Sequence, residues 1–266
     1  MKKILIAALT PFVLTMPVMA SLPSFAEGSG LTLLAQGTDT VKQMAQGFTV
    51  KILVGDTNGS GVIIGKTGNT YRVVTNAHVV TRSNSYKIQA TDRKVYAGKL
   101  LEKGSSLQGN DLAILTFESS ANYGVATLAE GPTLKPNDAV YSAGFPIDQS
   151  NFMITSGTVT EVTSQPLKGG YQLGYSADTL QGMSGGPLLN ASGQLIGVVG
   201  MGKGAALTEA YTYQDESRPA KDVINQWRGM SFAVPVATIN QIAGDVAKVP
   251  SGEGQAGGVL NLWKRV

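Results

Sequence analysis

The amino-acid sequence predicts an all-β fold made of two sets of strands that are similar in length and density. Short runs rich in β-branched residues recur along the chain, and turn residues separate them. Glycine accounts for 33 of the 266 residues, whereas charged residues make up only 15%. This composition suits a turn-rich β protein with many tight hairpins and does not suit a helical bundle.

The first 26 residues are typical of an export signal. Lys2 and Lys3 precede the apolar stretch Ile4–Ala20, and small-x-Ala sites end at Ala20 and at Ala26. A positive start, a short apolar region and a small-residue site together predict a cleaved signal peptide over residues 1–26. The alternative is an uncleaved anchor, which favours an unbroken run of about 20 apolar residues. The prediction is export to the periplasm or the exterior, with cleavage after Ala20 or Ala26 and no membrane association beyond that signal.

The first set of strands is expected over residues 48–118, after a polar and mixed stretch at 27–47 that predicts a mobile lead-in. The expected strands are Phe48–Val54, Val62–Ile64, Tyr71–Val74, Lys87–Gln89, Lys94–Tyr96 and Leu112–Leu115. Short strands at near-regular spacing indicate an antiparallel sandwich or barrel.

The second set is expected over residues 138–247, after a linker at 119–137 that contains two Xaa-Pro turns. Its expected strands are Ala139–Tyr141, Met153–Val162, Tyr171–Ser176, Gln194–Val199 and Ser231–Val236. Apolar residues at helical spacing predict a short helix over Val236–Val246. Gly204–Arg228 is interpreted as a surface insertion, and the glycine-rich end, 248–266, as a disordered tail.

Charge and residue usage exclude several classes of function. The formal charge is +3, and without Lys2 and Lys3 it falls to 19 − 18 = +1, so there is no basic surface for nucleic acid. The chain has no cysteine and one histidine, which argues against a conventional zinc site. Gly59–Gly65 lacks the G-x-G-x-x-G spacing and the following helix of a nucleotide loop. We therefore expect no metal and no cofactor.

A candidate nucleophile lies in the segment Gln181–Leu188. Gly182 would let its backbone N–H turn toward a substrate carbonyl, where a side chain would crowd the approaching chain. Ser184 is followed by two glycines that permit a tight exit and by a proline that leads into a strand. The alternative is a glycine-rich hairpin turn without chemistry.

A histidine and an aspartate complete the candidate constellation. His78, the only histidine, follows an expected strand, and Asp111 stands just ahead of another. Serine catalysis needs a base that takes the hydroxyl proton and an acid that fixes the tautomer of that base. A lone histidine is more often an ordinary residue, and Asp111 equally fits a turn that caps the strand entrance.

These segments resemble the trypsin-like (chymotrypsin-fold) serine peptidases, in particular the cysteine-free bacterial branch related to the HtrA and V8-type enzymes. The matching segments are Gly59–Ile64, Thr75–Val80, Asn110–Ala113, Gly182–Pro187 and Phe232–Pro235. The resemblance covers roughly residues 48–247. It implies two six-stranded antiparallel β-barrels with the active site between them.

The resemblance further implies an exported serine endopeptidase that cleaves proteins or peptides through an acyl-enzyme. His78, Asp111 and Ser184 would form the catalytic triad, and the N–H groups of Gly182 and Ser184 would form the oxyanion hole. The competing functions are a non-catalytic binding module that keeps the barrels and an esterase that uses the same site.

Specificity is left open by the sequence. Gly200, Met201 and Gly202 match the strand on which such enzymes lay the substrate backbone. Asp178 matches the base of the trypsin specificity pocket, which would select Arg or Lys at the P1 position. The other interpretation is a structural acid on the pocket wall. Met183 stands where animal relatives carry an aspartate, so we expect no activation by a freed N-terminus.

Overall fold

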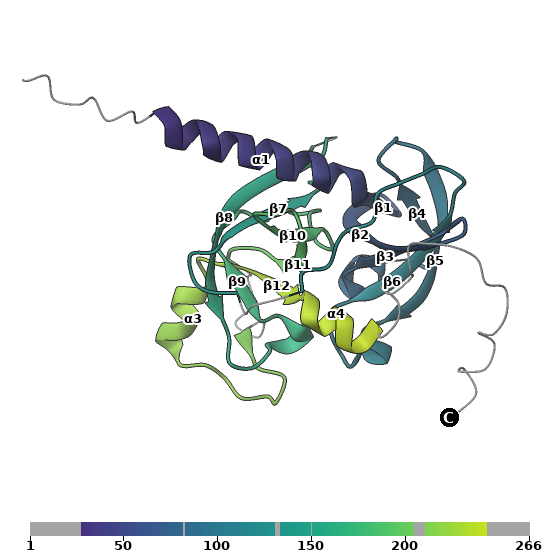
Figure 1. Ribbon diagram of the computed structural model, residues 1–266. Coiled ribbons are helices and arrows are strands. Elements are labelled where there is room, and N and C mark those ends of the chain that lie inside the picture. Colours follow the sequence, from purple (N-terminus) through teal and green to yellow (C-terminus); the bar gives the residue numbers. More distant parts are fainter. Residues whose placement is uncertain (1–27, 82, 131–133, 150, 205–210, 244–266) are drawn as a thin grey trace, which may run out of the picture.

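Two closed β-barrels form the body of the protein. The computed structural model describes residues 28–81, 83–130, 134–149, 151–204 and 211–243. Each barrel has six antiparallel strands, so the predicted all-β fold of two six-stranded barrels is confirmed (Figure 1). The predicted signal peptide at 1–26 and the predicted tail at 248–266 lie outside the described residues.

The first barrel closes in the order β1-β2-β3-β6-β5-β4. Its strands are β1 (Thr49–Val54), β2 (Thr57–Thr67), β3 (Thr70–Thr75), β4 (Tyr86–Gln89), β5 (Val95–Lys103) and β6 (Ala113–Glu118). In β1, mostly buried apolar residues alternate with partly exposed ones toward the end of the strand, as a barrel wall requires. The six runs expected from sequence are all strands, although β2 and β5 extend well beyond the expected segments.

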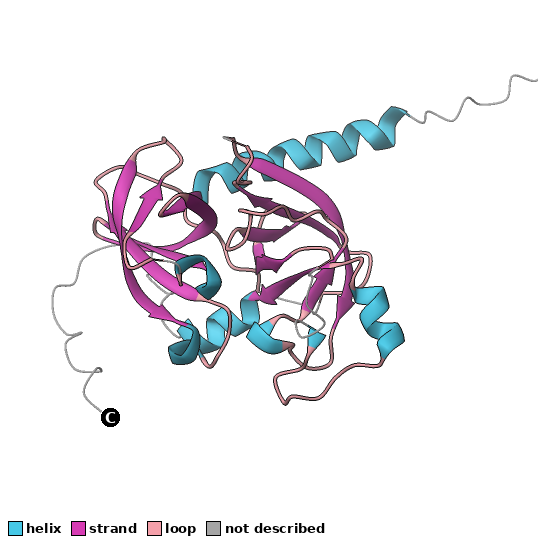
Figure 2. Cartoon of the chain, turned by 180° about the vertical axis from the view of Figure 1, so that it is seen from behind, coloured by secondary structure: helices cyan, strands magenta, loops and turns pink. Residues whose placement is uncertain are grey.

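The second barrel repeats the same order, β10-β11-β12-β9-β8-β7. Its strands are β7 (Ala139–Gly144), β8 (Met153–Val162), β9 (Leu173–Tyr175), β10 (Pro187–Asn190), β11 (Leu195–Met201) and β12 (Ser231–Pro235). The strand β10 follows directly from the nucleophile segment. Between β6 and β7 the described residues 119–130 and 134–138 contain no strand of either barrel. Figure 2 shows the two sets of strands side by side from the opposite direction.

Helix α1 (Gly28–Phe48) corrects the expectation of a mobile lead-in at 27–47. It contacts β2 and β7 and therefore bridges the two barrels, and it runs along the top of both in Figure 1. Val41, Ala45 and Phe48 are buried on its inner face. Glycines at positions 28, 30, 37 and 47 and the mixed composition of this stretch concealed the helix in the sequence.

Two further helices lie in the second half of the chain. The structure has α4 (Val236–Ala243) where a C-terminal helix was expected, and it packs on β11 and β12. Within the expected surface insertion, α3 (Lys221–Trp227) buries Ile224 and Trp227. This segment is thus partly anchored in the core, which its high charge did not suggest.

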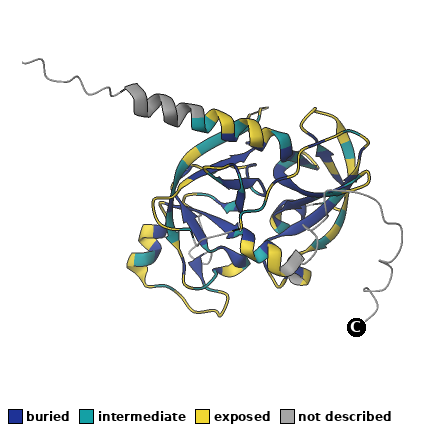
Figure 3. Ribbon diagram, in the orientation of Figure 1, coloured by how far each residue is buried: buried dark blue, intermediate teal, exposed yellow. Residues whose placement is uncertain are grey.

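The core consists of two clusters of buried side chains. One fills the first barrel and continues between the barrels to Tyr211, Trp227 and Phe232, while the other fills the interior of the second barrel around Tyr175 and Leu188. Most strands are accordingly buried, whereas β5 and much of β8 are partly or fully exposed (Figure 3). In the described part of the chain no helix has the length and hydropathy needed to cross a membrane.

Candidate active site

The nucleophile segment is a tight loop between β9 and β10, held by backbone hydrogen bonds from both barrels. The N–H of Ser60 in β2 donates to the carbonyl of Ser184 at 2.8 Å, and the N–H of Gly185 donates to Val199 at 2.7 Å. The hydroxyl of Ser60 donates to the carbonyl of Gly182 at 2.8 Å. Ser184 is therefore fixed at the junction of the barrels.

Gly182 is required by the neighbouring loop. Its φ of +97° lies in the region that side chains rarely adopt. A Cβ at this position would meet the carbonyl oxygen of Phe145 at 2.5 Å and the N–H of Ile147 at 2.7 Å. The expectation that a side chain here would crowd the substrate is thus corrected: it would first collide with residues 145–147 of the protein itself.

The peptide orientation around Gly182 leaves two N–H groups free. The carbonyl of Gln181 accepts from the N–H of Ile147 at 2.8 Å, and that of Met183 accepts from the N–H of Gly186 at 2.9 Å. In a trans peptide the N–H points away from the carbonyl, so these bonds turn the N–H groups of Gly182 and Ser184 to the opposite side. Within the described residues, no acceptor pairs with either N–H.

His78 lies in the short helix α2 (Ala77–Val80), which follows β3. The helix packs closely on β2: a Cβ at Gly59 would meet the Cγ1 atom of Val79 at 2.6 Å. The side chain of Asn76 donates to the carbonyl of Asp111 at 2.8 Å and joins the two loops that carry the histidine and the aspartate. The sequence predicted that His78 follows a strand. In the structure it lies in the single helical turn α2 directly after β3.

Asp111 holds His78 at two points. The backbone N–H of His78 donates to Oδ1 at 2.9 Å, and its Nδ1 lies 2.6 Å from Oδ2. Burial alone would raise the pKa of Asp111, but the hydrogen bonds and charge of His78 and a hydrogen bond from Tyr171 outweigh it, so the pKa is lowered. An ionised carboxylate only accepts hydrogen bonds, so Nδ1 carries the proton and Nε2 is left free to accept one.

Among the described residues, Ser184 makes no hydrogen bond to the histidine. Its hydroxyl donates to the carbonyl of Gly200 at 3.3 Å. Both residues nevertheless line one pocket, together with Asn58, Ile147 and Gly182 among others. Rotation about the Cα–Cβ bond of Ser184 changes which partner its hydroxyl reaches, and catalytic hydrogen bonds are often unformed without substrate.

The side chains of His78 and Asp111 differ in how far they are exposed to solvent. The side chain of His78 is 46% exposed and that of Asp111 only 17%. The imidazole is therefore open to a substrate, whereas the carboxylate is shielded behind it. No group of three or more potential metal ligands occurs among the residues that the structure describes.

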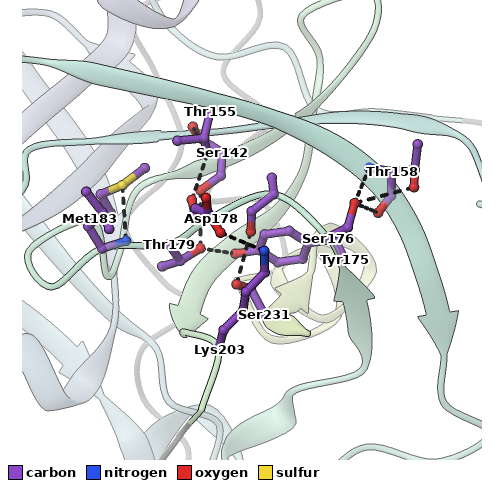
Figure 4. A network of polar contacts seen from close by, with 12 residues as sticks. Ser142, Thr155, Thr158, Tyr175, Ser176, Asp178, Thr179, Met183, Lys203 and Ser231 are labelled. Atoms are coloured by element: carbon purple, nitrogen blue, oxygen red, sulfur yellow. Dashed lines mark hydrogen bonds and ion pairs between the residues drawn. The ribbon is translucent and has the colours of Figure 1, made fainter. Parts of the chain in front are cut away.

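Asp178, the candidate specificity residue, is already paired. Its Oδ1 lies 2.6 Å from Nζ of Lys203, and the two side chains are 67% and 39% exposed. Figure 4 shows Lys203 reaching Asp178 beside the hydroxyl groups of Ser142, Thr155 and Thr179. A substrate cation would have to compete with Lys203 for this carboxylate.

The candidate substrate strand lies at the end of β11. Gly200 and Met201 belong to β11 and Gly202 follows it. The carbonyl of Gly200 accepts from Ser184, which brings this segment beside the candidate nucleophile. The structure thus places the predicted strand and the predicted nucleophile in contact.

Three residues at the site were not singled out from the sequence. They are Ser60, which holds the Gly182 carbonyl; Asn76, which holds the Asp111 backbone; and Tyr171, whose hydroxyl donates to Oδ2 of Asp111 at 2.5 Å. Ser60 and Asn76 belong to segments that carry the family resemblance. Tyr171 is 60 residues from Asp111 in the chain, and no local pattern marks it.

Comparisons with known proteins identify the family of the chain. The family model described as the trypsin-like peptidase domain matches residues 59–198, more than half of the chain. Serine protease HTRA1 of Xenopus tropicalis is 30% identical over 151 residues, which cover 53% of this chain and 30% of that protein. Serine protease HtrA-like of Staphylococcus aureus (strain USA300) is 28% identical over 207 residues, or 72% of this chain and 24% of the relative.

A solved structure shares the fold. The serine endoprotease from Yersinia pestis superimposes with a TM-score of 0.59 at 22% identity, covering 79% of this chain and 66% of that one. The chain therefore spans about a quarter to a third of the length of the curated relatives named above.

Proposed function

The chain belongs to the trypsin-like peptidase family, and on that premise we propose that it is a serine endopeptidase with His78, Asp111 and Ser184 as its catalytic triad. The observation that carries the proposal is the convergence at one pocket. An imidazole bound at Nδ1 by a shielded carboxylate and a serine flanked by free N–H groups line the same cavity. Proteins or peptides are the proposed substrates.

The proposed reaction begins when the hydroxyl of Ser184 turns to His78. Nε2 takes the hydroxyl proton as Oγ bonds to the scissile carbonyl carbon, and the resulting oxyanion accepts hydrogen bonds from the N–H groups of Gly182 and Ser184. His78 then gives this proton to the leaving amine, and the C–N bond breaks to leave an ester on Ser184. Water, deprotonated by His78, hydrolyses the ester and restores the serine.

The proposal is tested by hydrolysis of casein and of a fluorogenic peptide library. Ser184→Ala removes the nucleophile and should lower kcat by about 10⁴–10⁶. Ser192→Ala, in the exposed turn after β10, is the matched control and should retain full activity. Cleavage of short esters without casein cleavage would favour an esterase. Full casein cleavage by the Ser184 variant would overturn the assignment.

We also propose that the protein is exported to the periplasm or the exterior. The support is the pair Lys2-Lys3, the apolar stretch that follows and the two small-residue sites at Ala20 and Ala26. N-terminal sequencing of the protein recovered from outside the cytoplasm should find a start at Ser21 or Glu27. A chain that retains Met1 and stays with the membrane would indicate an uncleaved anchor.

A further inference from the structure

Tyr171 is a buried residue of the second barrel that contacts the aspartate of the first. It follows the short turn η2 (Lys168–Gly170) and is only 8% exposed. Its hydroxyl donates to Oδ2 of Asp111, the same oxygen that accepts Nδ1–H of His78. One carboxylate oxygen thus serves two donors that come from different barrels.

The turn before Tyr171 is shaped around Asp111. The carbonyl of Gly169 accepts from the backbone N–H of Asp111 at 2.8 Å. A Cβ at Gly169, whose φ is +80°, would lie 3.0 Å from the ring of Tyr171 and 3.2 Å from Cβ of Asp111. A Cβ at Gly170 would collide with the side-chain oxygen of Asn110. The two glycines therefore allow the turn to approach closely enough for both contacts with Asp111.

Gly200 leaves the space that the tyrosine occupies. A Cβ at Gly200 would overlap the hydroxyl and the ring of Tyr171. The same glycine accepts the hydroxyl of Ser184 through its carbonyl. A larger residue at position 200 would displace Tyr171 from Asp111, so the glycine on the candidate substrate strand and the tyrosine depend on one another.

The hydroxyl of Tyr171 is a permanent donor. Burial, the negative charge of Asp111 and the hydrogen bond to it keep the pKa of Tyr171 well above its ordinary value. The tyrosine therefore stays protonated throughout the range in which peptidases work. Among the described residues, His78 and Tyr171 are the titratable groups that bond to Asp111.

We propose that Tyr171 is a positioning residue that holds the Asp111 carboxylate from the second barrel, so that both carboxylate oxygens meet His78. The hydroxyl fixes rotation about the Cβ–Cγ bond of Asp111, while the carbonyl of Gly169 fixes its backbone. Without the hydroxyl, the carboxylate turns and its two bonds to His78 loosen. The proton acquired by the imidazole is then held less well, which slows acylation. This inference rests on the proposed peptidase function.

Tyr171→Phe tests the proposal because it removes only the hydroxyl. It should lower kcat about tenfold, the ordinary value of one hydrogen bond to a charged group, with KM within twofold. The acidic limb of the kcat profile should move to lower pH, since a loosened carboxylate stabilises the imidazolium less. Tyr71→Phe is the matched control, because Tyr71 is a buried residue of the first barrel whose hydroxyl donates to the carbonyl of Ala121 and accepts from the N–H of Tyr123. It should leave kcat and the pH profile unchanged.

A measurement without substrate separates this inference from the proposed function. Because His78 is the only histidine, the imidazole proton resonances of an untagged protein belong to it alone. The Nδ1 proton should give a low-field signal that moves upfield and exchanges faster in Tyr171→Phe, but not in Tyr71→Phe. An unchanged signal together with unchanged kcat would overturn the role of Tyr171. A wild-type protein that shows the signal but no peptidase activity would overturn the proposed function instead.

Discussion

His78 owes its orientation to a carboxylate that binds its backbone and its ring together. A contact through Nδ1 alone would leave the backbone of α2 free to shift. The bond from the backbone N–H to Oδ1 removes that freedom and fixes the ring relative to the helix. Nε2 is not engaged by Asp111, and His78 lines the same pocket as Ser184. The residue-scale account depends on this double contact more than on any single distance.

Asp178 illustrates how an ion pair within the chain changes the interpretation of a candidate specificity residue. The position of Asp178 was compatible with an Arg or Lys pocket and with a structural acid on the pocket wall, and in the structure Lys203 already binds the carboxylate. A substrate cation would gain little, since it would exchange one partner of the same charge for another. The ion pair with Lys203 therefore favours the interpretation of Asp178 as a structural acid on the pocket wall over that of a residue that selects Arg or Lys.

Lys203→Ala should uncover a preference that the wild-type protein lacks. With the carboxylate free, cleavage after Arg or Lys should rise about fivefold over cleavage after Ala, because an exposed pair contributes roughly 1 kcal/mol. A P1 peptide library compares the wild type, this variant and Lys94→Ala, which removes an ion pair in the first barrel. A strong Arg or Lys preference in the wild type, or none in Lys203→Ala, would contradict this explanation.

Individual residues differed in how far the sequence revealed them. His78, Asp111 and Ser184 stand in segments whose residue types are tied to their chemistry, so they could be proposed without coordinates. Tyr171 contributes a single hydroxyl across the contact between barrels, and that contact exists only after both barrels have closed. No spacing within the sequence encodes such a partner.

At the scale of elements, hydrogen bonds from neighbouring segments fix the backbone conformation of the loop that carries Ser184. Ser60 of β2 binds the carbonyl of Gly182, and Ile147 binds that of Gln181. The bond to the Gln181 carbonyl turns the Gly182 N–H to the opposite side of that peptide, while the bond from Ser60 holds the following peptide in place. The proposed oxyanion hole would thus be formed by the fold before substrate binds, which is the condition for strong electrostatic stabilisation.

Gly182→Ala should disrupt this loop. The added Cβ would contact the backbone of Phe145 and Ile147 and would strain a positive φ. Loss of one oxyanion donor should lower kcat about 10²–10³-fold with a smaller effect on KM. Steady-state kinetics on one peptide measures this loss.

Gly68→Ala is the control for this experiment. Gly68 also has a positive φ, of +58°, but a Cβ there meets nothing within 4 Å. It should cost some stability by its strain and leave kcat unchanged. Equal kinetic losses in both variants would mean that Gly182 matters only for folding.

Helix α1 is an element that the sequence did not predict. The strands are marked by β-branched runs and bounding turns, and their number and order could be anticipated with the family resemblance. The helix packs Val41, Ala45 and Phe48 against the two barrels, whereas its sequence is mixed and includes several glycines. Intrinsic propensity is a weak guide where packing decides.

For the molecule as a whole, the active site is also a junction between barrels. Asp111 of the first barrel binds Gly169 and Tyr171 of the second, and Ser60 of the first binds Ser184 and Gly182 of the second. Activity and the packing of the two barrels are therefore coupled. The strand pattern predicted two sets of antiparallel strands and the family resemblance implied that each forms a barrel, but the contacts between the halves could not be predicted.

Stability should depend on pH through Asp111. Its pKa is lowered by folding, so its contribution is present above the unfolded value of about 3.9 and is lost as pH falls through the lower folded value. Urea unfolding between pH 7 and pH 2 should show a steeper loss of stability for the wild type than for Asp111→Asn. Parallel curves for the two proteins would contradict a carboxylate stabilised in the folded state.

Covalent labelling by a fluorophosphonate tests the central claim most directly, since only an activated serine hydroxyl reacts. Mass spectrometry of the digested protein should find one label, on Ser184, and His78→Ala should abolish it while the protein remains folded by circular dichroism. An unlabelled wild type, or a label on Ser184 that forms at the same rate without His78, would contradict the account.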